Sequence, residues 1–117
     1  MSATQANFDG RSPYGPEAAK GDFLKETKPV ASYEPNAWGL YDMHGNVWEW
    51  CEDWYDKAYY ENSVRKDPVR RNGVRYRVNR GGGWDDEGDD CRSARRDWHS
   101  VNRRRNNYGF RIVIGEP

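Results

Sequence analysis

The chain has 117 residues, and its 19 basic and 19 acidic side chains give a formal net charge of zero. A chain of this length has room for one domain, 1–117. Hydrophobic residues make up 35% of the sequence, which is low, yet aromatic residues reach 15%. Disordered chains lack aromatic residues and usually carry net charge. We therefore expect a folded domain whose core is built from a few large rings.

The charge balance and the absence of long apolar runs exclude several classes of partner. A chain without net charge has no long-range attraction to nucleic acid or to an anionic membrane. The acidic stretch at 84–90 would also repel phosphate from the arginine run at 103–105. No run approaches the roughly 20 apolar residues of a membrane span, and residues 1–10 lack the apolar core of a signal peptide. We expect a cytoplasmic protein that binds neither nucleic acid nor membrane.

Residues 1–35 are rich in glycine, proline and polar side chains and have no sustained periodicity. This composition predicts irregular structure. A loop of this length is unusual in a compact domain, and such loops are normally functional or held by something other than a core. A bound metal ion would be one such anchor.

The rest of the chain shows strand patterns. NVWEWC (46–51) alternates and is rich in aromatic residues, which predicts a short buried strand. VRYRV (74–78) alternates again, which predicts a second strand. The glycine run at 81–83 that follows it favours a β-bulge or a close approach of another backbone segment. CRSARR (91–96) is a third candidate strand, and YGFRIVI (108–114) is the clearest one.

Helical patterns are missing. No window of about 11–18 residues has apolar positions at the helical period, and residues 97–107 between the last two strands are predicted to be a loop. A small sheet with so few aliphatic residues would leave one face poorly covered. We therefore expect part of the fold to be supplied from outside this chain.

Four separated motifs carry a family resemblance: NAWGLYDMHGNVWEWCEDWY, RVNRGGGW, CRSARR and YGFRIVI. In their order and spacing they resemble the formylglycine-generating-enzyme (sulfatase-modifying factor) family over residues 6–114. The resemblance implies an α+β family with a C-type-lectin-like fold, of which this chain would supply mostly short antiparallel strands, long irregular loops and little helix. It corresponds to the C-terminal half of the domain, with an irregular calcium-loop region at 1–35 and a strand-rich core at 36–117.

The family binds calcium, and the resemblance implies two sets of ligands in this chain. Calcium takes about six to eight oxygen ligands from carboxylates, amides and carbonyls. The first set consists of the side chains of Asn7 and Asp22 and the backbone oxygens of Phe8 and Leu24. The second set consists of the side chains of Asp42 and Glu49 and the backbone oxygens of Gly45 and Val47. A carboxylate on a buried strand needs a partner, so an ion pair between Glu49 and an arginine is the alternative.

Active members of the family oxidise a substrate cysteine to formylglycine with two copper-binding cysteines. The first matches Asp86 in this sequence, which cannot act as a thiolate ligand. The second falls on Cys91 when counted forward from Gly81, but on a non-cysteine position when counted backward from the GFR motif. Copper-dependent oxidation is therefore an alternative that we do not favour, with Cys91 as its one candidate catalytic residue.

The two cysteines have further readings. Cys51 and Cys91 would lie on neighbouring strands, so either a disulfide or two buried thiols is open, and a cytoplasmic location favours the thiols. A nucleophile pair of Cys51 with His44 is conceivable. On a strand beside tryptophans, however, a cysteine is more often a small buried hydrophobe.

The segment between GGGW and GFR is dense in residue types that form contact surfaces. Family members of the variable-protein type, made by diversity-generating retroelements, carry their variable positions here. The resemblance implies candidate ligand contacts at Trp84, Asp85, Asp86, Asp89, Asp90, Arg95, Asp97, Trp98, His99, Asn106 and Asn107. The alternative is a solvated loop whose acids and arginines pair with each other.

These observations favour a non-catalytic, calcium-stabilised C-type-lectin-like module that binds a protein or small ligand through residues 84–108. A copper-dependent oxidase of peptidyl cysteine is the competing enzyme class. A third alternative is a structural subunit that completes a second chain carrying the N-terminal half of the domain.

Overall fold

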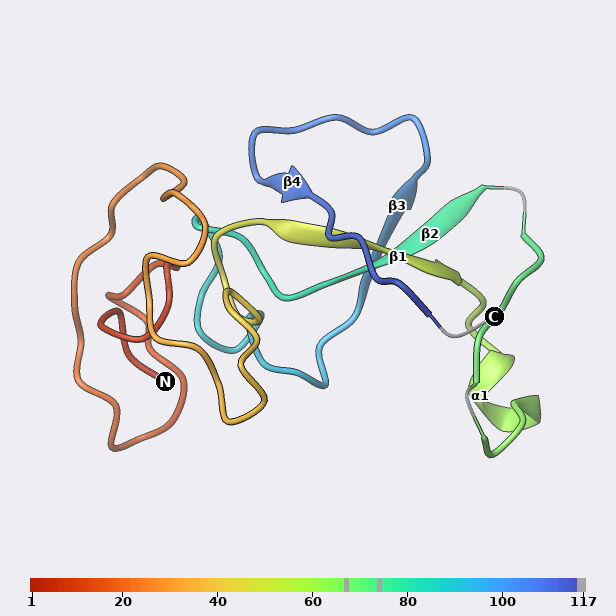
Figure 1. Cartoon of the computed structure of the whole chain (residues 1–117), viewed down its shortest axis with the longest axis horizontal. Coiled ribbons are helices and arrows are strands. Elements are labelled where there is room, and N and C mark those ends of the chain that lie inside the picture. Colours follow the sequence, from red (N-terminus) through yellow and green to blue (C-terminus); the bar gives the residue numbers. More distant parts are fainter. Residues whose placement is uncertain (67, 74, 116–117) are drawn as a thin grey trace.

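The computed structural model describes residues 1–66, 68–73 and 75–115, and its elements are strands joined by long loops (Figure 1). They follow the order β1 (Trp48–Trp54), α1 (Tyr59–Asn62), β2 (Tyr76–Arg80), β3 (Asp97–Ser100) and β4 (Tyr108–Gly109). The four strands form one sheet in the order β3-β2-β1-β4. β2 pairs antiparallel with both β1 and β3, whereas β4 joins β1 in parallel. The expected fold class, mostly strands with very little helix, is confirmed.

β1 and β2 form close to the positions that alternation predicts. β1 begins two residues later than the predicted strand at 46–51 and continues to Trp54, because pairing with β2 resumes beyond a register irregularity between Trp50 and Trp54. The predicted strand at 74–78 is shifted toward the glycine run and ends at Arg80, which lies opposite Glu49. Position 74 itself lies outside the described residues.

The prediction of a strand at 91–96 and a loop at 97–107 is wrong. Residues 91–96 form turns, in which the amide of Cys91 donates to the carbonyl of Gly88 and the amide of Arg95 to that of Arg92. The third strand is instead β3, within the predicted loop. The reason is tertiary: β3 is paired along its whole length with β2, which overrides its polar sequence.

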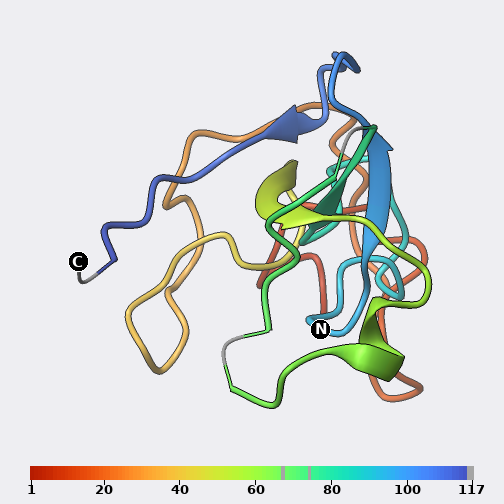
Figure 2. The same ribbon diagram turned by 90° about the vertical axis from the view of Figure 1, so that its right-hand side faces the viewer.

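The strand predicted at 108–114 ends after Gly109. The side chains that follow are exposed, from 72% at Phe110 to 96% at Ile114. Figure 2 shows this segment leading away from the sheet toward the C-terminus. The apolar alternation predicts a strand correctly only where β1 supplies a neighbour.

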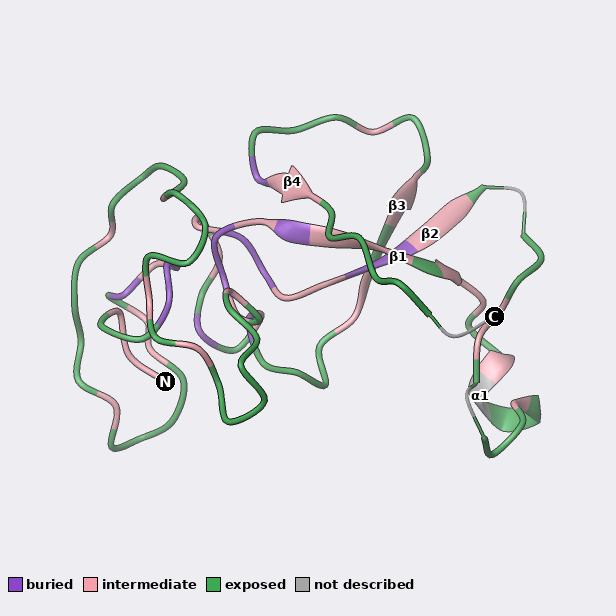
Figure 3. Ribbon diagram, viewed as in Figure 1, coloured by how far each residue is buried: buried purple, intermediate pink, exposed green. Residues whose placement is uncertain are grey.

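The core is small and lies where the N-terminal loops meet the sheet (Figure 3). Ala6, Phe8 and Cys91 form one buried apolar cluster, and Trp48 and Val78 are the buried apolar side chains on the described strands. Residues 1–47 are irregular apart from an isolated bridge between Asn7 and Gly45. No helix among the described residues is long and apolar enough to cross a membrane.

Candidate functional site

The turn that enters β1 is held in an unusual backbone conformation. Asp42, Gly45 and Asn46 have φ values of 52°, 74° and 66°. A side chain at Gly45 would overlap the carbonyl oxygen of Asn7, so the close approach requires glycine. The amide of Gly45 donates to the carbonyl of Gly81 at 2.7 Å, and the amide of Asn46 donates to the Asn7 oxygen at 2.7 Å. The turn therefore joins the N-terminal loops to the glycine run.

Asn46 ties the same region together with its side chain. Its Oδ1 accepts from the amide of Lys28 at 2.9 Å and from Nδ2 of Asn7 at 3.1 Å. Its Nδ2 donates to the carbonyl of Lys28 at 3.1 Å. Because Asn46 is buried and these bonds satisfy its amide, it is a structural residue of the turn.

The first predicted calcium set surrounds one cavity. Asn7, Phe8, Asp22 and Leu24 all line a hollow of about 360 Å³. Nδ2 of Asn7 donates to the carbonyl of Glu26 at 2.9 Å as well as to Asn46, and Asn7 Oδ1 accepts no hydrogen bond from the residues that the structure describes. The four residues of the first set thus share one cavity, and the oxygens predicted as their ligands are of the kind that a hard cation such as calcium takes.

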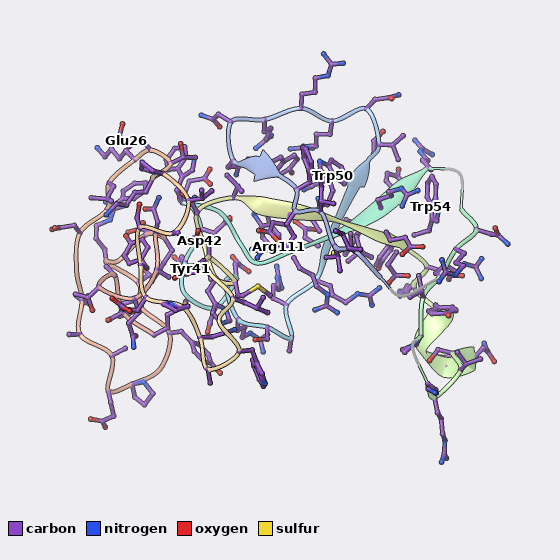
Figure 4. All side chains as sticks on the ribbon, viewed as in Figure 1. Glu26, Tyr41, Asp42, Trp50, Trp54 and Arg111 are labelled. Atoms are coloured by element: carbon purple, nitrogen blue, oxygen red, sulfur yellow. The ribbon has the colours of Figure 1, made fainter. Side chains whose placement is uncertain are left out.

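In the second predicted set, Glu49 and the backbone carbonyl of Asp42 bind an arginine, whereas the Asp42 carboxylate accepts from the amide of Ala31 at 2.8 Å. Arg111 donates from Nε and Nη2 to the two carboxylate oxygens of Glu49, both at 2.6 Å. The same guanidinium donates to the carbonyls of Tyr41 at 3.1 Å and Asp42 at 3.2 Å, and these residues lie close together in Figure 4. Hydrogen bonding to Glu49 raises the pKa of Arg111. A calcium ion at this set must therefore compete with a cation already bound to Glu49.

Asp86, which matches the first oxidase cysteine, and Cys91, the candidate for the second, are both part of the packing. Oδ2 of Asp86 accepts from Nε1 of Trp48 at 2.6 Å and from the amide of Gly83 at 2.8 Å. Cys91 is fully buried. Burial raises the pKa of the Cys91 thiol to about 12, so it is protonated at neutral pH. Neither position offers an accessible thiolate.

Cys51 and His44 each have a hydrogen-bond partner other than the other. Both cysteines are free thiols, and the half-buried Cys51 donates weakly to the carbonyl of Glu49. Burial raises the pKa of Cys51 as well. Nδ1 of His44 lies 2.6 Å from the carbonyl oxygen of Cys91. Among the described residues, no three histidine, cysteine or acidic side chains form a cluster that could hold a metal ion.

The ends of the predicted binding segment, 84–108, are fixed to the rest of the molecule. The amide of Trp84 donates to the carbonyl of Asn46, and the Trp84 ring stacks on Phe23. Near the other end, buried Asn107 donates from Nδ2 to Asp85 at 2.8 Å, and its carbonyl accepts from the amide of Trp48. Asn107 therefore faces the interior, as does the carboxylate of Asp86, another predicted contact.

The middle of the segment presents its side chains outward or half outward. Trp98 stacks on Tyr55 with ring centroids 4.1 Å apart and remains 42% exposed. His99 stacks on Tyr108, and burial lowers the pKa of His99. The exposed members of the predicted contacts are Asp85, Asp89, Arg95, Trp98 and Asn106. The half-buried members are Trp84, Asp86, Asp90, Asp97 and His99.

The sequence profile of the sulfatase-modifying factor enzyme 1-like domain matches residues 2–115. The chain belongs to this family. The serine/threonine-protein kinase pkn1 of Chlamydia caviae is 43% identical over 110 residues, which are 90% of this chain and 18% of that protein. The formylglycine-generating enzyme of Streptomyces coelicolor is 38% identical over 109 residues, which are 91% of this chain and 34% of the enzyme.

A solved structure with the same fold, Treponema denticola variable protein 1, is 30% identical with a TM-score of 0.73 and covers 92% of this chain. The match covers 34% of that variable protein. The family resemblance read from the four motifs is thereby confirmed. This sulfatase-modifying-factor-type chain spans about a third or less of the length of the three relatives named here.

Two residues of the sulfatase-modifying-factor-type site had no assigned role in the sequence. Arg111 belongs to the GFR motif, and its partner Glu49 is 62 positions away. Asn46 lies in the motif that leads into β1, where its side chain joins two loops. The sequence signal that could have found both is that they lie within the family motifs. Each of them completes the hydrogen bonding of a turn.

Proposed function

We propose that this sulfatase-modifying-factor-type chain is a non-catalytic, calcium-stabilised C-type-lectin-like module that binds a protein or small ligand through residues 84–108. The observation that carries the proposal is the construction of this segment. Its ends are fixed by backbone bonds at Trp84 and Asn107, while Trp98 between them remains 42% exposed. A rigid frame that presents aromatic and charged side chains lowers the entropy lost on binding.

A non-catalytic role agrees with the residue that matches the first oxidase cysteine, Asp86, and with the candidate for the second, Cys91. Asp86 has no thiol, and its carboxylate is used by the indole of Trp48 and the amide of Gly83. Cys91 is fully buried and protonated. Since a thiolate is the form that binds a metal or attacks a substrate, this chain does not supply the pair that copper-dependent oxidation needs.

The calcium part of the proposal rests first on the cavity lined by Asn7, Phe8, Asp22 and Leu24. Bound there, calcium would be held by the two side chains and two backbone oxygens, with water completing its coordination. Its contribution is structural, because the cavity lies among irregular loops that have few buried apolar residues of their own. At Asp42 and Glu49, calcium would bind in competition with Arg111.

Ligand binding is tested by selecting a random-peptide phage library on the immobilised full chain. Peptides selected on the wild type should bind Trp98→Ala about tenfold more weakly or worse, because exposed aromatic residues dominate such interfaces. The matched control is Trp38→Ala, which removes an 85% exposed tryptophan outside the segment and should leave binding unchanged. Failure to select peptides, or equal loss in both variants, would contradict a binding surface at 84–108.

A further inference from the structure

The loop that joins β3 to β4 has a run of three arginines at its centre, residues 103–105, which we call the arginine turn. Figures 1 and 2 show this loop projecting beyond the two strands that it connects. The amide of Arg103 donates to the carbonyl of Ser100 at 2.8 Å, and the amide of Tyr108 donates to that of Arg105 at 3.3 Å. Backbone hydrogen bonds therefore hold the arginine turn at both of its ends.

The three arginines differ in what their side chains contact. Arg103 is half-buried, and its guanidinium lies 6.0 Å from the centroid of the Tyr108 ring. Arg104 and Arg105 are exposed, and within the described ranges their side chains form no hydrogen bond or ion pair. The turn thus presents two guanidinium groups to solvent on adjacent residues, where their like charges repel each other.

The positive charge of the turn acts on the aromatic side chains beside it. Burial lowers the pKa of His99, and the charges of Arg103 and Arg105 lower it further against the opposing charge of Asp97. Oδ2 of Asp97 lies 3.4 Å from Nε2 of His99, so this carboxylate faces the imidazole and does not pair with the turn. The turn therefore keeps its positive charge inside the proposed binding segment.

The acids of the same segment are occupied elsewhere or lie apart from the turn. Asp90 pairs with Arg95 at 3.0 Å, and Asp85 accepts from the side chain of Asn107 at 2.8 Å. Asp89 is exposed, and the stretch that carries it is separate from the arginine turn in both Figure 1 and Figure 2. The surface 84–108 therefore has an acidic end and a basic end.

We propose that the arginine turn binds the carboxylates of an acidic stretch in the protein or peptide ligand of segment 84–108. The inference rests on the proposed binding function and names the chemistry at one end of that surface. A planar guanidinium donates two parallel hydrogen bonds to one carboxylate. Arg104 and Arg105 together suit a ligand with two acids close in sequence, and binding such a ligand relieves the repulsion between them.

The mixed charge of the surface favours a protein ligand over a uniform polyanion. A nucleic acid or an anionic membrane that covered both ends of the segment would place negative charge against Asp85 and Asp89, which are exposed. A protein ligand can present acids to the turn and basic or neutral groups to these aspartates. The 42% exposed ring of Trp98 offers a further contact, to an apolar side chain of the same ligand.

The experiment selects a random-peptide phage library on the immobilised full chain and compares the selected sequences with the unselected library. We expect aspartate and glutamate to be enriched at adjacent or alternate positions. The selected peptides are then synthesised and used as the probes, and their affinities are measured by fluorescence anisotropy. The affinity for the wild type should fall as the salt concentration rises, because exposed charges are screened.

Three double variants test the turn itself. Arg104→Gln combined with Arg105→Gln should weaken binding of the selected peptides by about tenfold or more. Replacing both arginines with lysine keeps the charge but removes the planar fork, and should restore only part of the affinity. The matched control is Arg65→Gln combined with Lys66→Gln, which removes two exposed positive charges outside the segment and should leave binding unchanged.

The outcomes separate this inference from the proposed function. Selected peptides that require Trp98 but show no excess of acids, or that bind the glutamine variant of the turn as tightly as the wild type, would overturn the inference alone. Equal weakening by the control pair would also overturn it, because net charge would then explain the effect. Tighter turn-dependent binding of single-stranded DNA or of phosphatidylserine vesicles would assign the turn to phosphate instead. Failure to select any peptide would overturn both the inference and the proposed function.

Discussion

Replacing Gly45 with alanine tests whether the N-terminal loops contact the turn before β1. Gly45 has a φ of 74°, and a side chain there would overlap the carbonyl oxygen of Asn7 and lie 2.9 Å from its carbonyl carbon. Gly39 provides a matched control with a φ of 75° and nothing within 4 Å of an added side chain. The two substitutions impose the same backbone strain and differ in their contacts.

The expected magnitudes follow from these contacts. Alanine in the left-handed region costs about 1–2 kcal/mol, partly offset by about 0.4–1 kcal/mol from the reduced freedom of the unfolded chain. Gly39→Ala should therefore lower the free energy of unfolding by about 1 kcal/mol. Gly45→Ala must also displace the Asn7 backbone, which adds about 1–3 kcal/mol for overpacking and about 1 kcal/mol for the hydrogen bond from Asn46.

Urea unfolding followed by tryptophan fluorescence measures both variants against the wild type. We expect Gly45→Ala to lose about 2–4 kcal/mol more than Gly39→Ala, or to fail to fold where the control folds. Equal losses in the two variants would refute the contact between residues 7 and 45. In that case the loops would not be anchored to the turn in the way the bridge between Asn7 and Gly45 indicates.

Three further perturbations have defined outcomes. Burial raises the pKa of Asp86, so the folded state favours its protonated form and loses stability as pH rises through that pKa. Asp86→Asn should therefore be more stable than the wild type at neutral pH in urea unfolding, with no advantage in acid. Iodoacetamide should modify Cys51 but not Cys91 in the native chain, which mass spectrometry measures. Because burial raises the pKa of Cys91 to about 12, the stability that its thiol contributes should be lost as pH rises from 9 to about 12, and Cys91→Ala should not show this loss. Arg111→Gln should raise calcium affinity at Glu49 by roughly tenfold in calorimetry, whereas unchanged affinity would mean that the guanidinium and calcium do not compete.

The strands that could be predicted from the sequence are those whose side chains alternate and whose neighbours lie nearby. β1 was predictable because Trp48 and Trp50 alternate with residues of the other face, and β2 because VRYRV alternates before the glycine run. β3 was not, because its sequence, DWHS, carries turn-favouring residues and becomes a strand through pairing with β2. The prediction for CRSARR failed for the opposite reason, because no described strand pairs with it. Its backbone turns instead, and the carbonyl of Ser93 accepts from the side chain of Arg80 in β2.

The candidate site was predictable in its residue types more than in its partners. A carboxylate beside two tryptophans required a cation or a hydrogen-bond donor, and the sequence left both calcium and an arginine open for Glu49. Which arginine pairs with it depends on the parallel register of β4 and β1, which sequence spacing does not specify. The inward position of Asn107 likewise follows from its bonds to Asp85 and Trp48, which form when the segment closes.

The most direct test of a calcium-stabilised module is thermal unfolding of the full chain with calcium, with magnesium, and with chelator. A ligand at about one hundred times its dissociation constant stabilises the folded state by about 2.7 kcal/mol, which is on the order of 10 °C in melting temperature for a domain of this size. We predict that calcium raises the melting temperature of the wild type, that Asp22→Asn loses most of this rise, and that Asp89→Asn, an exposed acid outside both sets, keeps it. No rise with calcium, or an equal rise in both variants, would contradict calcium binding at the cavity lined by Asn7 and Asp22.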